Sequence, residues 1–263
     1  MNAGERGTGR MAPRDRRVTA AAVVALALML AGCASAPSSA DRAGADGEVT
    51  VFAAASLRTA FDAIAEAFRT AHPEVTVHPI VYDGSSVLVT QLTEGAHADV
   101  LATADERTMQ TAVDAGLATD PQIFATNTLV VAMPAGNPAG VSTLSDLADA
   151  TTVLCAPEVP CGAATKRLLA SAGLSVTPAS VEQNVTAVLQ KVVEGEADAG
   201  IVYATDVRGE DVDSFTPEGA DDVVSRYPLA ALDGSSEAAA TFVAFVQGPQ
   251  GQRLLADAGF GTP

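Results

Sequence analysis

The chain has 263 residues, and its 15 Lys and Arg against 32 Asp and Glu give a formal net charge of −17. This length can bury one large core or two smaller ones, and a hydrophobic content of 48% is too high for a disordered chain. Nucleic-acid binding is excluded because the chain has too few basic residues to neutralise phosphates and only 4% aromatic residues for base stacking. By itself, the acidic balance predicts cationic partners.

Residues 1–33 have the composition of an export signal. They contain five Arg and two acidic residues, and the apolar run 18–30 is interrupted only by Thr19. A run of about 13 residues is too short to span a bilayer, but a basic start, a short apolar run and small residues after it are typical of a signal peptide. Without this segment the chain keeps 10 basic and 30 acidic residues, a charge of about −20.

The signal ends in Leu-Ala-Gly-Cys at residues 30–33, which resembles the lipobox of bacterial lipoproteins. This resemblance implies that Cys33 is lipidated and becomes the first mature residue; the alternative is a small buried Cys inside an uncleaved signal. Residues 34–47 are small and polar, as in a flexible tether. We therefore expect an extracytoplasmic protein anchored to the cell membrane, through more than one acyl chain if the anchor is stable.

Elements alternate along the rest of the chain. Leu57, Phe61, Ile64 and Phe68 form one apolar stripe at helical spacing, and glycines follow several of the later helices. The predicted strands are residues 48–55, 75–82, 98–103, 127–133, 151–156, 199–203 and 223–232. The first predicted helix begins near residue 57. The other predicted helices cover residues 87–94, 106–115, 144–150, 162–172, 181–194, 237–246 and 249–258. Such alternation predicts mostly parallel sheets with right-handed crossovers, and about 215 ordered residues fit two α/β lobes better than one core.

Cys155 and Cys161 lie six residues apart, with two prolines between them. Outside the cytoplasm, two neighbouring thiols usually pair, and the prolines favour a tight loop. A disulfide is therefore expected, with two free thiols as the alternative. Zinc is a weaker interpretation because the three histidines of the chain show no ligand spacing.

Four predicted helices begin directly after small, polar or hydroxyl residues. The segments at or near these starts are residues 53–56 (AAAS), 84–86 (GSS), 159–162 (VPCG) and 183–185 (QNV), and they contain Ser56, Ser85, Cys161 and Val185. Helix starts carry unsatisfied N–H groups and the positive end of the helix dipole, so several of them converging would bind an anion without any cation. Ordinary helix capping uses the same residue types, so no single start identifies a ligand.

Enzyme motifs are absent from the sequence. There is no G-x-S-x-G elbow, no phosphate-binding loop with G-x-x-x-x-G-K-[ST] and no G-x-G-x-x-G. His72 and His97 lie in predicted turns, where they are expected to be solvated. The sequence therefore predicts a protein that is not an enzyme.

Residues 49–57 (VTVFAAASL), 84–86 (GSS), 94–105 (EGAHADVLATAD) and 200–206 (GIVYATD) resemble the periplasmic molybdate-binding proteins of ABC transporters. This resemblance covers residues 48–263. It implies a type II periplasmic-binding-protein fold with a ligand cleft between two α/β lobes. The first lobe would hold residues 48–127 and 224–263, and the second would hold 128–223.

The resemblance also implies a ligand site, position by position. Ser56 and Ser85 match the two serines of the family, and Cys161 and Val185 match positions that donate backbone N–H groups. Tyr203 matches the tyrosine whose hydroxyl reaches the oxyanion. Molybdenum would be present only inside the bound oxyanion, without protein ligands to the metal and without any cofactor.

Two positions depart from the family pattern. Cys161 stands where the family has a small residue, a change that a backbone donor tolerates. Asp83 directly precedes the GSS segment, where a carboxylate would repel an anion, so we expect its side chain to face away.

The sequence thus predicts a monomeric solute-binding subunit that captures molybdate or tungstate and delivers it to an ABC permease. Alternatives are a binding protein for another oxyanion such as sulfate, or for a small carboxylate, although none of the five positions is the Arg that carboxylate binders tend to use. A serine hydrolase using Ser56 or Ser85, or a purely structural lipoprotein, are more distant alternatives. If neutral dipoles bind the anion, the net charge of the chain describes its surface and not its site.

Overall fold

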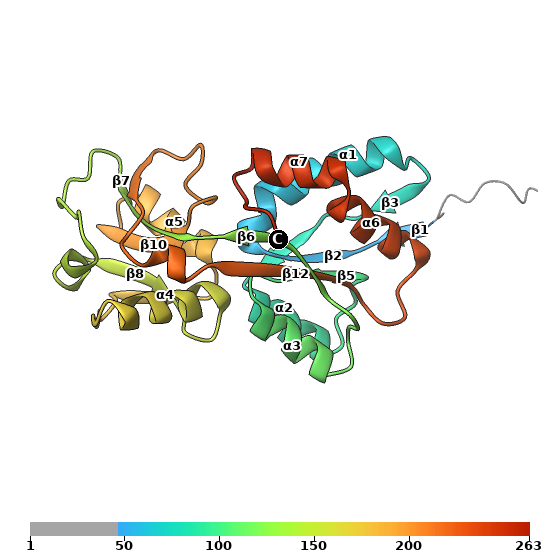
Figure 1. Ribbon diagram of the computed structural model, residues 1–263, viewed down its shortest axis with the longest axis horizontal. Helices are drawn as coiled ribbons and strands as arrows, with labels where there is room; N and C mark the ends of the chain where they lie inside the picture. Colours follow the sequence, from blue (N-terminus) through green and yellow to red (C-terminus); the bar gives the residue numbers. More distant parts are fainter. Residues whose placement is uncertain (1–46) are drawn as a thin grey trace, which may run out of the picture. The chain divides into compact units, whose positions relative to one another are not determined.

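Two five-stranded mixed sheets organise residues 47–263, the part of the chain that the computed structural model describes (Figure 1). These residues lie within one compact unit. The predicted signal peptide, the predicted lipidation site Cys33 and nearly all of the predicted tether lie outside the described residues. Gly47, the last residue of that predicted tether, already belongs to the first strand.

The first sheet has the strand order β4-β2-β5-β12-β6, and the second has the order β11-β7-β10-β8-β9. We call the parts of the chain built on them the first lobe and the second lobe. The strands of the first sheet, in that order, are Val81–Asp83, Val51–Ala54, Val100–Ala102, Ser225–Ala231 and Gln122–Asn127. Those of the second are Val212–Phe215, Leu129–Pro134, Ala199–Tyr203, Thr152–Cys155 and Ser180–Glu182. A separate parallel pair joins β1 (Gly47–Val49) to β3 (Val75–Val77).

Helices pack on both sheets. Those of the first lobe are α1 (Arg58–Ala71), α2 (Ser85–Thr93), α3 (Glu106–Asp114), α6 (Glu237–Gln247) and α7 (Pro249–Asp257). Those of the second lobe are α4 (Pro160–Ser171) and α5 (Val185–Val193), and both contact β8 and β10. Short 3₁₀ helices occupy η1 (Ala55–Leu57), η2 (Leu144–Ala148) and η3 (Ala220–Asp222).

The chain passes between the lobes along two runs (Figure 1). Strand β6 belongs to the first sheet and β7, which follows after one residue, belongs to the second. Strand β12 then returns the chain to the first sheet, where it pairs antiparallel with both β5 and β6. Because of these runs, each five-stranded sheet has two parallel and two antiparallel pairings, so the sheets are mixed and not mostly parallel as the alternation predicts.

Apolar burial explains the main helices. The stripe predicted for α1 is buried, with Phe61, Ile64 and Phe68 fully inside. Phe61 packs against Phe124 and Phe242, and Phe68 packs against Phe242. Helix α1 is thereby fixed between its sheet and the C-terminal helices.

Two long predicted strands are each divided in two. The segment 48–55 becomes β1 and β2 followed by η1, and the segment 75–82 becomes β3 and β4. Pro79 lies in the second interruption, and proline has no N–H to donate to a sheet. Strands β6 and β11 were not predicted, and the predicted strand 127–133 is the end of β6 plus most of β7.

The predicted helix 181–194 is wrong at its start. Residues Ser180–Glu182 form β9, which pairs in parallel with β8, and α5 begins only at Val185. Val181 is 52% exposed, so it does not belong to the buried stripe that Val188 and Val192 form. The side chain of Asn184 accepts a hydrogen bond from Ala187 N–H (3.0 Å) and sets the helix start.

Candidate ligand-binding site

A small cavity lies where helix starts of both lobes meet. Residues from the first lobe line one part of it and residues from the second lobe line the other. The lining residues are Ala54, Ala55, Ser56, Asp83, Gly84, Ser85, Ala104, Pro160, Cys161, Asn184, Val185 and Tyr203. Two larger hollows, of about 670 and 420 Å³, lie on the second lobe and contain none of the five predicted ligand residues. The small size of the cavity suits an ion better than a large organic ligand.

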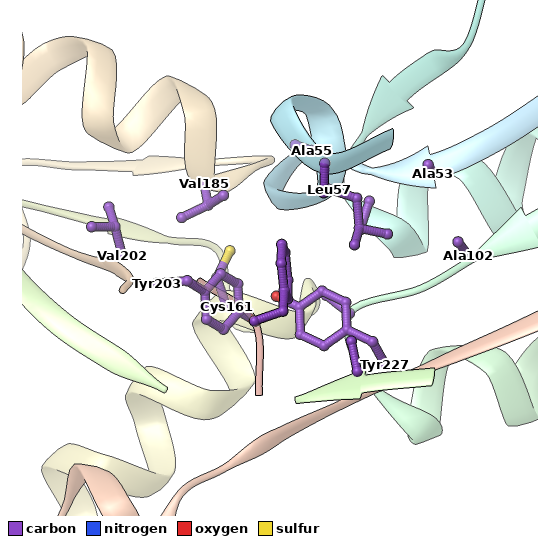
Figure 2. Close-up of a cluster of buried hydrophobic side chains, with 14 of the residues drawn as sticks. Ala53, Ala55, Leu57, Ala102, Cys161, Val185, Val202, Tyr203 and Tyr227 are labelled. Atoms are coloured by element: carbon purple, nitrogen blue, oxygen red, sulfur yellow. The ribbon is translucent and has the colours of Figure 1, made fainter. Parts of the chain in front are cut away.

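All five predicted ligand residues line this one cavity. Ser56 lies in η1 after β2, and Ser85 is the first residue of α2. Cys161 is in the first turn of α4, Val185 is the first residue of α5, and Tyr203 ends β10. In Figure 2, Val185, Cys161 and Tyr203 of the second lobe face Ala55 and Leu57, which flank Ser56 in the first lobe. Sequence segments up to 147 residues apart therefore converge, as the resemblance implied.

Three residues that line this cavity have backbone N–H groups without protein acceptors. Within residues 47–263, the N–H groups of Ser85, Cys161 and Val185 make no hydrogen bond to a backbone or side-chain acceptor. The first N–H groups of a helix cannot be satisfied inside the helix, and together they carry the positive end of its dipole. Three helix starts thus present donors to the same small space.

The two serine hydroxyls are oriented by neighbours. Ser85 Oγ accepts a hydrogen bond from Ala104 N–H (3.0 Å), which leaves its own hydrogen available as a donor. Ser56 Oγ lies 2.9 Å from the hydroxyl oxygen of Tyr227, on β12. Both serines are buried, with exposed fractions of 1% for Ser85 and 8% for Ser56. They are therefore held in place without a ligand.

The hydroxyl of Tyr203 is buried and, among the described residues, meets no hydrogen-bond partner. Burial raises the pKa of Tyr203 well above its usual range. The hydroxyl groups of Ser225 and Tyr227 lie near enough to lower it, but neither makes a hydrogen bond of ordinary geometry with the Tyr203 hydroxyl. The hydroxyl therefore stays protonated at neutral pH. A buried hydroxyl without a partner is costly, by about 1–3 kcal/mol, and this one lines the cavity.

Asp206 holds the end of β10 in position. Its Oδ2 accepts a hydrogen bond from Tyr203 N–H (2.8 Å), and its own N–H donates to Tyr203 O (3.0 Å). Burial of the carboxyl raises the pKa of Asp206 to about 7, although the bond from Tyr203 N–H lowers it. Asp206 does not line the cavity; it fixes the turn behind Tyr203.

The sequence predicts that the Asp83 side chain faces away from the site, but Asp83 is one of the residues that line the cavity. Its Oδ1 accepts hydrogen bonds from Gly84 N–H (2.7 Å) and from Asn184 Nδ2 (2.9 Å). The second bond joins the two lobes. The carboxylate is thus engaged by two donors at the wall of the cavity.

The expected disulfide between Cys155 and Cys161 is present. It closes the loop between β8 and α4, so the first turn of α4 is covalently tied to the sheet. A Cβ atom on Gly162 would collide with the carbonyl oxygen of Ala156, so only glycine allows the helix to approach this loop so closely. The N–H donor of Cys161 is thereby fixed on both sides.

Cations are missing from the cavity wall. The described residues that line it include no Arg, Lys or His, so an anion bound there would be held by neutral donors. Residues 47–263 contain no cluster of three or more His, Cys, Asp or Glu suited to a metal ion. Over the same residues, no helix combines the length and the apolar character needed to cross a membrane.

The sequence did not predict Tyr227 as part of the site, and it did not reveal the roles of Asn184 and Asp83, although both lie next to predicted ligand residues. Tyr227 positions Ser56, Asn184 caps α5, and Asp83 joins the lobes. A signal for Tyr227 did exist, because it is one of only three Tyr residues and lies in a strand predicted to return to the first lobe. For Asn184 the signal was its place before an apolar helical run, which is typical of an N-cap.

Known proteins share this architecture. The bacterial extracellular solute-binding protein family matches residues 49–261. A molybdate-binding protein ModA from Mycobacterium tuberculosis is 44% identical over 223 residues, which are 82% of this chain and 85% of the relative. A putative ABC transporter substrate-binding lipoprotein, YvgL from Bacillus subtilis, is 30% identical over 244 residues, 89% of this chain and 93% of the relative.

A solved structure supports the fold. The periplasmic molybdate-binding protein of Azotobacter vinelandii superimposes with a TM-score of 0.71 at 18% sequence identity, over 82% of this chain and 99% of that one. The family match extends over almost all described residues, and the alignments with the two sequence relatives cover most of the length of each relative. The chain therefore belongs to the bacterial extracellular solute-binding protein family.

Proposed function

We propose that this protein captures a tetrahedral oxyanion, molybdate or tungstate, in the cavity between its lobes and delivers it to an ABC permease. The ligand residues would be Ser56, Ser85 and Tyr203 through their hydroxyls, and Cys161 and Val185 through their backbone N–H groups. The chain is a solute-binding protein and not an enzyme, like the relatives it matches. No cofactor takes part, because molybdenum is the cargo.

Neutral donors suffice for such a ligand. Molybdate is a dianion, and each hydrogen bond to a charged group contributes about 1.5–3 kcal/mol. Five to seven such bonds give about 8–20 kcal/mol, against an association cost of about 4–15 kcal/mol. The difference allows micromolar or tighter binding. A site of fixed size would select among dianions of equal charge by their radius, and tungstate resembles molybdate in both respects.

The single observation that supports the proposal most strongly is the hydroxyl of Tyr203. It is buried, protonated at neutral pH and without a partner among the described residues, and it lines the same cavity as three unpaired helix N–H groups. A buried donor without an acceptor is costly unless a ligand supplies one. Each of these groups can donate a hydrogen bond, so a ligand with several acceptor atoms, such as an oxyanion, would satisfy them together.

Isothermal titration of the protein with molybdate, tungstate, sulfate and phosphate tests this proposal. Molybdate and tungstate are expected to bind with similar affinity, and sulfate and phosphate at least about a hundredfold more weakly, a difference of about 2.7 kcal/mol. Preferential binding of sulfate or phosphate would overturn the ligand assignment, and absence of heat with all four would overturn the oxyanion site.

We further propose that the lobes divide into residues 48–127 with 224–263 and residues 128–223, and that the protein works as a monomer held at the membrane through Cys33. The relative YvgL is itself described as a putative lipoprotein, which supports the anchor. Metabolic labelling of producing cells with a radioactive fatty acid tests it. Label on the wild type and none on a Cys33→Ser variant is expected, whereas equal labelling would contradict the anchor.

A further inference from the structure

We propose that Asp83 and Asn184 form a positioning pair that holds the two lobes together over the ligand and fixes the first turn of α5 against it. This inference rests on the proposed function and adds two residues to it. Neither residue is one of the five proposed ligand contacts.

Asp83 and Asn184 make a direct hydrogen bond between the lobes. Asn184 Nδ2 donates to Asp83 Oδ1 at 2.9 Å, and both residues line the cavity. Gly84 N–H donates to the same oxygen, which keeps the carboxylate turned towards the second lobe. A hydrogen bond to an ionised acceptor is stronger than a neutral one, and this one is partly shielded from water.

The amide of Asn184 serves two partners at once. Its Oδ1 caps α5 by accepting from Ala187 N–H, while its Nδ2 reaches the carboxylate of Asp83. Ser and Asp cap helices about as well as Asn does, but the side chain of neither offers an N–H donor to a second group. Because Val185 follows Asn184 directly, the bond between Asn184 and Asp83 also fixes the position of the Val185 N–H group.

Backbone contact at the same point supports a closed arrangement. A Cβ atom on Gly84 would collide with the carbonyl oxygen of Gln183, so the two lobes touch here without space for a methyl group. Other bonds between the lobes exist, since Ser86 Oγ and Arg107 donate to Glu158 O at 2.8 and 2.9 Å. Those bonds are exposed to water, whereas the bond between Asp83 and Asn184 is partly buried.

Exchange of the two side chains provides the test. Asn184→Ser keeps a good helix cap and adds no charge, but it loses the bond between the lobes. Asn184→Asp also keeps the cap and places a second carboxylate opposite Asp83. In the double variant Asp83→Asn with Asn184→Asp, the amide and the carboxylate have changed places, so the bond can form again and the total charge equals that of the wild type.

Affinity for molybdate by isothermal titration is the main measurement, with thermal unfolding as a check that each variant folds. Each single Asn184 variant is expected to bind about tenfold more weakly. The exchanged double variant is expected to return to within about threefold of the wild type, because the pairwise interaction lost in the single variants is restored. Recovery would not occur if either residue acted only within its own lobe, so a double variant as weak as Asn184→Asp would overturn the proposal.

Failure of the proposed function would look different, because the wild type would then bind none of the tested oxyanions. The pair is in that case judged by small-angle X-ray scattering of the ligand-free protein. Asn184→Asp is expected to have a larger radius of gyration than the wild type, and the double variant a restored one. Equal radii for all three proteins would overturn the pair on this measurement.

Discussion

The hydroxyl oxygens of Ser56 and Tyr227 lie 2.9 Å apart inside the protein, one in the 3₁₀ helix η1 that follows β2 and the other on the returning strand β12. Tyr227 Oη also lies 3.4 Å from Asn127 Nδ2, which can only donate to it. The hydrogen of Tyr227 is therefore free to be donated to Ser56 Oγ, and the hydrogen of Ser56 is free for a ligand. Asn127 in turn donates to Thr205 Oγ1 of the second lobe, so this chain of bonds joins both lobes to the site.

Substitutions of Ser56 and Tyr227 should weaken molybdate binding by different amounts. Ser56→Ala removes a ligand donor and should weaken molybdate binding by about 1–3 kcal/mol without unfolding the protein. Tyr227→Phe keeps the ring and only releases the Ser56 hydroxyl, so a loss of about 0.5–1.5 kcal/mol is expected. Titration calorimetry measures both. Unchanged affinity in Ser56→Ala would exclude Ser56 as a ligand residue.

Tyr203→Phe separates ligand binding from folding. The hydroxyl has no partner among the described residues, so removing it should leave the free energy of unfolding of the ligand-free protein unchanged or slightly higher. Affinity for molybdate should fall by about 1.5–3 kcal/mol, the contribution of one hydrogen bond to a charged group. Denaturant unfolding and calorimetric titration measure the two quantities. A variant that loses stability but keeps its affinity would show that the hydroxyl serves the core.

Gly84→Ala tests the contact between the lobes. Gly84 has an ordinary φ of −57°, so alanine fits its own backbone, but the added methyl group would collide with Gln183 O of the other lobe. Relief of such overlap costs about 1–3 kcal/mol, so molybdate should bind at least about fivefold more weakly. The melting temperature should change little, because each lobe can keep its own packing.

Gly95→Ala is the matched control in the same lobe. Gly95 has a φ of +98° and open space around it. An alanine there is strained in its own backbone, so stability should fall by about 1 kcal/mol while affinity stays unchanged. The opposite pattern in the two variants would contradict the assigned roles.

The stability of the ligand-free protein should depend on the ionisation of Asp206. Its pKa in the folded protein is raised to about 7 from an ordinary value near 3.8, which means that the folded state favours the protonated form. Its contribution to stability is therefore complete below about pH 4 and is lost as the pH rises through about 7. Asp206 is partly exposed, so we expect a loss of about 1–3 kcal/mol, below the value for a fully buried carboxyl.

Asp206→Asn isolates this effect from the other acidic residues. The amide oxygen can still accept from Tyr203 N–H, but it does not ionise. The difference in free energy of unfolding between the variant and the wild type should grow in favour of the variant from pH 4 to pH 8. Parallel curves over this range would show that Asp206 titrates normally.

The local sequence pattern correctly predicted elements such as α1, whose formation depends on packing within a single lobe. The stripe of Leu57, Phe61, Ile64 and Phe68 predicted α1 because a helix buries one face against its own sheet. Val181 misled the prediction because it continues the spacing of α5, although it belongs to β9 and faces solvent. Strand β6 was missed because it follows a turn and its identity depends on pairing with β12, about 100 residues later.

The features of the site also divide into those that the local sequence pattern predicts and those that depend on packing between distant parts of the chain. Helix starts at Ser85 and Val185 were visible because capping residues and apolar runs mark them locally. The bond between Asp83 and Asn184, and that between Ser56 and Tyr227, join residues 101 and 171 positions apart. Such contacts are set by how sheets and lobes pack, which one sequence does not reveal. The resemblance supplied Tyr203, which local pattern would have assigned to the core.

Val185 offers the most direct measurement of the central claim, that backbone N–H groups at helix starts hold the oxyanion. Val185 is the first residue of α5, where proline is well tolerated, and Asn184 already has the extended backbone (φ −152°, ψ 164°) that suits a following proline. Val185→Pro removes the N–H, whereas Val185→Ala keeps it and shortens the side chain. Calorimetric titration with molybdate should show a loss of about 1.5–3 kcal/mol for the proline variant and less than about 0.5 kcal/mol for the alanine variant. Equal affinities in the two folded variants would contradict the claim.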